Sequence, residues 1–143
     1  MSHTIQSTNP SLPPYGLTLL RISLGVMWIS HALLKLLVFT LPGTVEFFQS
    51  VGFPGFLVYP VFAAELAGGT ALVLGLYARQ VSLALVPVLM AAASVHIGNG
   101  WVFTSPGGGW EYPVFLIVVS LVVWLVGDGA LALRRSDRFV PAH

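Results

Sequence analysis

Residues 17–39 read LTLLRISLGVMWISHALLKLLVF, an almost unbroken apolar run. A helix needs about 20 apolar residues to cross roughly 30 Å of hydrocarbon, so this run predicts a membrane-spanning helix. Further apolar runs cover residues 57–77, 81–97 and 113–133. Strands of a membrane barrel would alternate apolar and polar residues, and these runs do not. The sequence therefore predicts an all-α integral membrane protein, a four-helix bundle embedded in a lipid bilayer.

The composition of the chain agrees with this class. Of its 143 residues, 56% are hydrophobic and 8% are charged, whereas about 25% are charged in an average soluble domain. The formal net charge of +1 is too small to indicate a nucleic-acid partner. The chain has no cysteine, which excludes disulfides, thiol catalysis, iron–sulfur clusters held by this chain and covalently attached haem of the usual kind. Redox chemistry would need a non-covalent cofactor or a partner subunit, and no metal site is predicted.

The chain divides into three parts. Residues 1–16 form a polar N-terminal segment, residues 17–133 the membrane domain, and residues 134–143 a basic C-terminal tail. Residues 1–14 hold no lysine or arginine, and no small-residue cleavage site follows the long first apolar run, which argues against a cleavable signal peptide. We therefore expect the first helix to remain in the mature protein.

The arginines predict the orientation of the bundle. With four crossings, both termini and the turn at 77–81 lie on one side, together with Arg21, Arg79, Arg134, Arg135 and Arg138. The opposite side holds only Lys35. Cytoplasmic segments are enriched in Lys and Arg, so we expect cytoplasmic termini and external segments at 40–56 and 98–110. Asp128 is expected at the arginine side, as an ion-pair candidate for Arg21 and Arg79.

Small residues predict where helices pack closely. A smooth stripe in the second helix repeats every four residues: Ala63, Ala67, Ala71 and Gly75. Such stripes allow a neighbouring helix to approach. At about 100° per residue, Glu65 lies on a different face, with Gly68 and Gly69.

The two external segments differ in composition. Residues 45–53 are either a short amphipathic helix in the membrane interface, with Phe47, Phe48 and Val51 on one face, or a plain connector. The segment 98–110 is too rich in Gly and Pro for a helix. Its Trp101 and Trp110 suit the headgroup boundary.

Ionisable residues gather in the outer half of the predicted bundle. They are His31, Lys35, Glu65, His96 and Glu111. His31 and Lys35 are four residues apart and share a helix face with Trp28. Charged groups at this depth usually pair with each other or face a cavity. The set therefore predicts either a structural group that fixes helix register, or a binding or proton-handling site.

These residues show a family resemblance. The segments LRISLGVMWISHALLK, GFPGF, AELAGGTALVLGLYAR and GDGALAL, with His96, resemble the DoxX family of small four-helix bacterial membrane proteins. The most specific matches are Glu65, Gly68, Gly69, Gly75, Leu76 and Arg79. The chain departs from the family pattern at Ala32, where glycine is usual, and at Asp128, where proline is frequent.

The resemblance implies a bacterial inner-membrane location and a link to quinone redox systems. An apolar cavity could accept a quinone ring and tail while histidine, lysine and carboxylate handle its oxygens and protons. His31 and Lys35 would then donate to a quinone oxygen, and Glu65 would hold Lys35 or relay a proton. Trp28, His96 and Glu111 complete the predicted binding set. Electrons would come from a redox partner subunit.

Besides a transporter, which no internal repeat in the sequence supports, two other interpretations stay open at this stage. In one, the chain is a non-catalytic scaffold or accessory subunit, which docks a redox or stress-response partner or a second copy of itself. In the other, which is the least favoured, His31 and His96 ligate a haem. Whether the chain is an enzyme is left undecided.

Overall fold

The computed structural model describes residues 12–136, and this part of the chain is helical, with turns and no β-strand. Its elements are α1 (Pro13–Leu33), the π-helical turn η1 (Leu34–Val38), α2 (Leu41–Ser50), η2 (Gly55–Leu57), α3 (Val58–Leu74), α4 (Ala78–His96), η3 (Ile97–Asn99) and α5 (Glu111–Val126). The predicted all-α class is confirmed.

Three helical segments of the described chain are long and apolar enough to cross a membrane: Pro13–Val38, Gly55–Leu74 and Ala78–Asn99. The fourth predicted helix, expected over 113–133, is shorter, because α5 ends at Val126. Gly127 follows with φ 122° and Gly129 with φ 83°, backbone angles that end a helix. At 1.5 Å per residue, 16 residues span only about 24 Å. A fourth complete crossing therefore stays a prediction.

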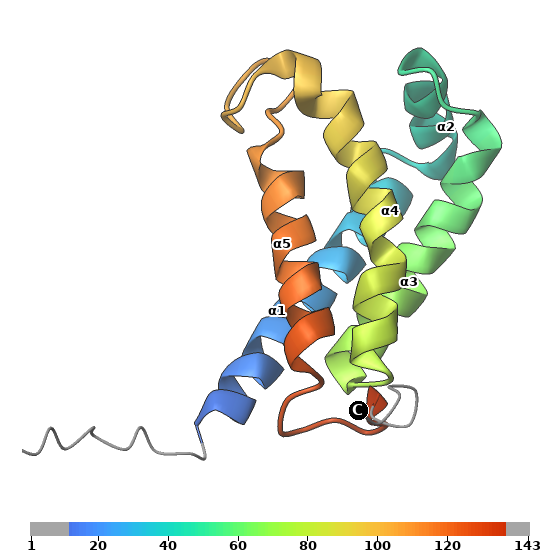
Figure 1. Cartoon of the computed structure of the whole chain (residues 1–143). Helices are drawn as coiled ribbons and strands as arrows, with labels where there is room; N and C mark the ends of the chain where they lie inside the picture. Colours follow the sequence, from blue (N-terminus) through green and yellow to red (C-terminus); the bar gives the residue numbers. More distant parts are fainter. Residues whose placement is uncertain (1–11, 137–143) are drawn as a thin grey trace, which may run out of the picture.

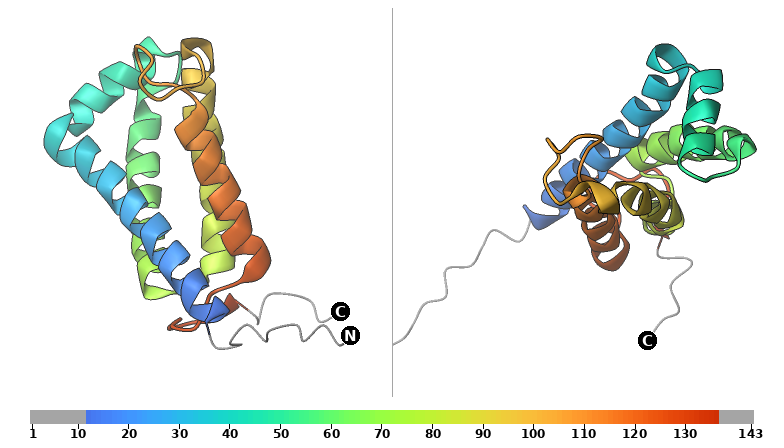
Figure 2. Two further views of the ribbon diagram at one scale, coloured as in Figure 1. Left: turned by 90° about the vertical axis from the view of Figure 1, so that its left-hand side faces the viewer. Right: turned by 90° about the horizontal axis from the view of Figure 1, so that it is seen from above.

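The long helices form two closely packed pairs, α1 with α3 and α4 with α5 (Figure 1). Figure 2 shows α1 leaning away from α3 toward the end of the bundle that carries α2 and the 97–110 loop. We call this the loop end. The first and last described residues lie at the opposite end, which we call the arginine end.

Two glycines, and not the alanine stripe, set the closest helix contact. A Cβ at Gly25 would lie 2.7 Å from the carbonyl oxygen of Gly69, and one at Gly69 would lie 2.8 Å from that of Gly25. These distances are too short for any side chain, so α1 and α3 cross backbone to backbone. Ala63 and Ala67 are exposed. Ala71 is half-buried and Gly75 is buried, so only part of the predicted stripe faces outward, and contact between this part and another helix stays a prediction.

The arginine end is closed by the irregular segment 127–136, which folds back under the helices (Figure 1). Asp128 accepts the N–H of Ala78 at 3.1 Å, the N–H of Ser136 at 2.8 Å and the hydroxyl of Ser136 at 2.6 Å. Arg21 donates to the carbonyl of Leu131 at 2.6 Å. Asp128 is thus a capping group for α4. Between residues 12 and 136 it makes no ion pair with Arg21 or Arg79 within 4 Å, contrary to expectation.

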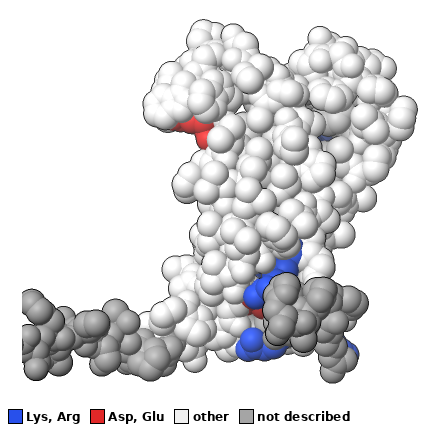
Figure 3. Space-filling view, viewed as in Figure 1, with Lys and Arg blue, Asp and Glu red and all other residues white. Residues whose placement is uncertain are grey.

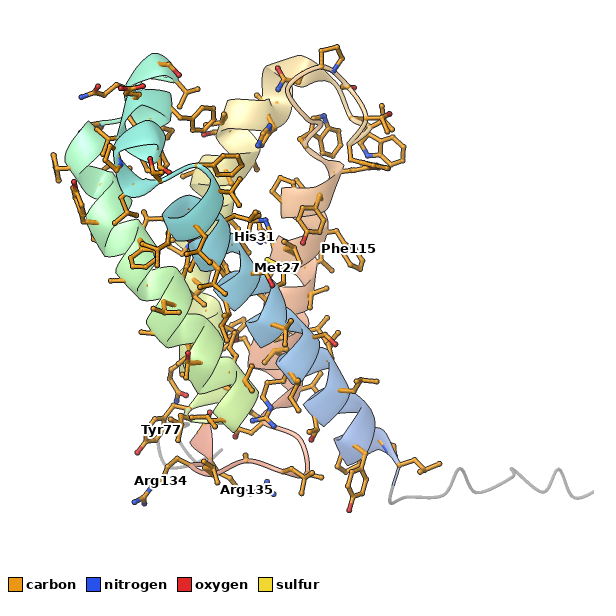
Figure 4. All side chains as sticks on the ribbon, turned by 180° about the vertical axis from the view of Figure 1, so that it is seen from behind. Met27, His31, Tyr77, Phe115, Arg134 and Arg135 are labelled. Carbon is orange, nitrogen blue, oxygen red and sulfur yellow. The ribbon has the colours of Figure 1, made fainter. Side chains whose placement is uncertain are left out.

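The basic residues cluster as predicted. Most of the Lys and Arg surface visible in Figure 3 lies at the arginine end, and Figure 4 shows Arg134 and Arg135 there. Arg138 lies outside the described residues. Which side of the membrane this end faces stays a prediction.

The first connection contains a helix. The helix α2 begins after Thr40, whose Oγ1 accepts the N–H of Gly43 at 3.2 Å. Thr40 therefore satisfies one of the free N–H groups of the first turn. The helical alternative for this segment is confirmed, although α2 begins and ends earlier than the predicted range 45–53.

Candidate ligand-binding cavity

A cavity of about 370 Å³ lies near the loop end and is lined by residues from all five α-helices. Its walls are mostly apolar and aromatic, with Met27, Phe39, Phe47, Phe48, Phe53, Val61, Leu89 and Leu116 among them. The phenylalanines of α2, Phe47 and Phe48, are among the residues that line it. Small-molecule sites typically occupy about 300–1,000 Å³, so this cavity is large enough for one ring system.

One ion pair gives the cavity a polar end. The Nζ of Lys35 lies 2.9 Å from Oε1 of Glu65, and their side chains are 16% and 4% exposed. Lys35 stands in the π-helical turn Leu34–Val38, a local widening of the helix that is frequent at functional sites. Glu65 lies on the buried face of α3, with Gly69 and Leu72. The pairing of α1 with α3 therefore brings the two charges together.

His31 is held by its own helix. Its Nδ1 lies 2.9 Å from the carbonyl oxygen of Met27, one turn earlier. A carbonyl can only accept, so Nδ1 carries the proton, and no described residue bonds to Nε2. In the neutral ring Nε2 is therefore an acceptor, and it donates only when the ring is protonated. Figure 4 shows His31 above Met27 and far from the arginine end.

Tyr112 is a cavity residue that the sequence did not single out. Its ring stacks on the His31 ring, with centroids 6.1 Å apart and planes at 24°. The sequence interpretation chose its neighbour Glu111, because a carboxylate carries more obvious chemistry. Neighbouring residues of a helix point in directions about 100° apart, so Tyr112 can face the cavity while Glu111 faces away from it.

Two buried polar atoms at the cavity have no partner among the described residues. They are Nε1 of Trp28 and Oε2 of Glu65. Both residues line the cavity, and Trp28 is 2% exposed. Leaving a buried polar atom unpaired costs about 1–3 kcal/mol, so such atoms call for an explanation. A polar molecule bound in the cavity would supply hydrogen-bond partners for these two atoms.

The remaining two predicted residues bind the loop. His96 lines the cavity, and its Nδ1 lies 3.0 Å from the carbonyl oxygen of Gly107. Glu111 does not line it. Its Oε1 accepts the N–H of Phe103 at 2.8 Å, which holds the 97–110 loop against the start of α5.

Glu111 lines a second, more open hollow at the loop end. This hollow has a volume of about 860 Å³ and an aromatic lining that includes Trp101, Phe103 and Trp110. It shares His96 and Tyr112 with the first cavity. The structure thus brings Trp28, His31, Lys35, Glu65 and His96 to one cavity and leaves Glu111 on the far side of Tyr112.

The long apolar helices define a helical membrane protein, and between them lies a mostly apolar cavity with one buried ion pair. Comparison with known proteins identifies the family. The DoxX family model matches residues 16–98, which contain all five of the predicted residues that line the cavity. The chain belongs to the DoxX family.

Two curated bacterial relatives match most of the chain. It is 32% identical over 126 residues to "Putative oxidoreductase CatD" of Bacillus subtilis (strain 168), covering 87% of each chain. It is 34% identical over 125 residues to a protein of Haemophilus influenzae named "Uncharacterized protein", covering 86% of this chain and 91% of the relative. No solved structure matches the chain.

Proposed function

We propose that this protein is the membrane subunit of a quinone-linked oxidoreductase system and binds a quinone in the 370 Å³ cavity. The observation that carries the proposal is the polar end of an otherwise apolar cavity. Lys35 and Glu65 form an ion pair there, and the same cavity is lined by Trp28 and Glu65, each with a buried polar atom that lacks a partner among the described residues. A quinone combines an apolar ring and tail with polar oxygens, and this arrangement of walls and donors suits it.

The chain's residues would bind and orient such a molecule. The ammonium of Lys35 has three N–H donors and gives one to Glu65, so it can give another to a carbonyl oxygen. Trp28 offers a second donor at Nε1. Glu65 fixes Lys35 and can pass a proton, and the ring of Tyr112 keeps His31 in place. When bound, the quinone would supply the capacity to accept two electrons and two protons.

A partner subunit belongs to this proposal. The chain has no cysteine, so it cannot supply electrons from a thiol or from a cysteine-bound cluster of its own. The B. subtilis relative is named a putative oxidoreductase, which supports a redox setting. We place the protein in the bacterial cytoplasmic membrane, with the arginine end toward the cytoplasm.

The competing function is a scaffold that docks a partner and binds no small molecule. The outward-facing Ala63 and Ala67 on α3 favour it, because small residues permit close contact with another membrane helix. In that case the Lys35–Glu65 pair only holds α1 on α3. The two functions differ in whether the cavity takes up a ligand.

Ligand-induced stabilisation of the purified protein in detergent tests the proposal. A short-chain quinone analogue should raise the melting temperature of the parent with increasing occupancy. A folded His31→Leu variant should lose this response. Ser30→Ala, at an exposed position on the same helix outside the cavity, is the matched control and should keep it. No stabilisation of the parent at any concentration would leave the scaffold function, and a Soret band in the absorption spectrum would favour haem.

A further inference from the structure

The unpaired atoms of the cavity differ in hydrogen-bond character. Oε2 of Glu65 belongs to a carboxylate whose other oxygen accepts from Lys35, and an ionised carboxylate only accepts. Nε2 of neutral His31 is also an acceptor, since Nδ1 donates to Met27. The buried acceptor on Glu65 needs a ligand that brings a hydrogen-bond donor, and the acceptor on His31 can take a second one.

The hydrogen-bond donors that line the cavity need acceptors. Nε1 of Trp28 and the remaining N–H groups of Lys35 need a ligand that brings acceptors. The ligand that pairs with both kinds of group must therefore donate and accept.

The two redox forms of a quinone differ in this respect. The carbonyl oxygens of the oxidised form accept hydrogen bonds but cannot donate them. Each hydroxyl of the reduced form, a quinol, donates one hydrogen bond and still accepts. No bulk water competes within the hydrocarbon region, so an acceptor without a donor stays unpaired there.

Resting on the proposed function, we infer that the cavity binds the quinol form of its ligand more tightly than the quinone form. A quinol hydroxyl satisfies Oε2 of Glu65 while its oxygen still accepts from Lys35 or Trp28. The quinone satisfies the donors alone. The acceptors on Glu65 and His31 therefore determine the preference, and the donor on Trp28 contributes to the affinity for both forms.

The preference has a thermodynamic consequence for the bound pair. Tighter binding of the reduced form raises the midpoint potential of the bound quinone above that of the free one. For a two-electron couple, each tenfold ratio of affinities corresponds to about 30 mV. The cavity would thus favour reduction of its ligand and retain the product.

Dissociation constants of both forms test the inference on the purified full-length chain in detergent. The probe is one short-chain ubiquinone analogue, measured oxidised and, under anaerobic conditions, as its quinol. We expect the quinol to bind about tenfold more tightly, the ratio that one more hydrogen bond to a charged group supports. Equal affinities, or tighter binding of the quinone, would overturn the inference and leave the proposed function standing. Binding of neither form would overturn both.

Two variants assign the preference to its groups. In Lys35→Met with Glu65→Gln, the ion pair is removed as a whole, and the Gln side chain can donate to a carbonyl oxygen, so the ratio should fall toward one or reverse. Trp28→Phe keeps the ring and removes the N–H, so both affinities should fall while the ratio stays. A ratio unchanged in the double variant would contradict the role of Glu65. If that variant does not fold, the ratio measured on the parent still decides the inference.

Discussion

At the scale of single residues, the Lys35–Glu65 ion pair is the feature on which the cavity depends. The carboxylate of Glu65 is more deeply buried than the ammonium of Lys35, with 4% against 16% of the side chain exposed. Lys35 can extend toward the membrane surface if its partner is lost, whereas Glu65 cannot. The two partners should therefore respond differently to mutation.

We predict that Lys35→Met destabilises the protein by about 3 kcal/mol, because it leaves the more deeply buried Glu65 carboxylate without its partner. Glu65→Gln should cost less, because the lysine that it leaves without a partner can extend toward the membrane surface. The double variant should cost less than the sum of the two. Thermal unfolding of the four proteins in detergent gives the coupling energy. Additive effects would show that the two residues are not partners, and Glu46→Gln, at an exposed position on α2, is the control.

Asp128 is the corresponding residue at the arginine end. It accepts three hydrogen bonds, one from the first residue of α4 and two from Ser136. Asp128→Ala should cost about 2 kcal/mol, near the upper end for loss of an N-terminal helix cap. The unfolding midpoint in detergent checks this, with Glu46→Ala as an exposed acidic control. A midpoint unchanged in Asp128→Ala would show that residues 127–136 are not held by this side chain.

At the scale of elements, the crossing of α1 and α3 positions the cavity. The backbones of α1 and α3 meet at Gly25 and Gly69, one turn of α3 from Glu65 toward the arginine end. From this crossing toward the loop end, α1 leans away from α3 (Figure 2). The aromatic side chains of α2 then line the space beyond the crossing. The cavity thus forms because α1 and α3 are in close contact at the two glycines and are farther apart near the loop end.

We predict that Gly69→Val prevents this crossing, because a Cβ there would meet the backbone of α1 at 2.8–2.9 Å. The variant should unfold at a lower temperature and lose quinone binding. Ala67→Leu, on the exposed face of the same helix, should leave the isolated chain folded. Thermal unfolding and size-exclusion chromatography of both variants separate the two effects. Reduced stability of Ala67→Leu with intact Gly69→Val would place the contact on the alanine stripe after all.

At the scale of the whole molecule, the sequence predicts the elements better than their contacts. The apolar runs locate the long helices, because burial in lipid depends on local composition. The apolar run does not predict where α5 ends. The helix ends at Gly127, and the segment after it is held by Asp128, which bonds to Ala78, a residue that is distant in sequence. The pairing of Lys35 with Glu65 follows from charge and depth. Helix packing determines which side of α5 faces the cavity, and thus that Tyr112 lines it and Glu111 does not.

The proposed orientation of the molecule rests on its arginines. If the arginine end faces the cytoplasm, as we propose, the 97–110 loop is external, so Thr104→Cys, at an exposed position in a chain without cysteine, should react in intact cells with a membrane-impermeant maleimide. Arg135→Cys, at the arginine end, should react only after permeabilisation. The reverse pattern would place the termini outside and overturn the orientation.

The central claim is that a quinone occupies the cavity beside Lys35 and Glu65, and photolabelling locates it most directly. A photoreactive azido-quinone is irradiated with the purified protein, and the labelled peptides are identified by mass spectrometry. We predict labelling of cavity residues of α1 and α2, such as Trp28 and Phe48, which an excess of unlabelled quinone suppresses. Labelling confined to outward-facing residues such as Leu125, or unaffected by the excess, would contradict the claim.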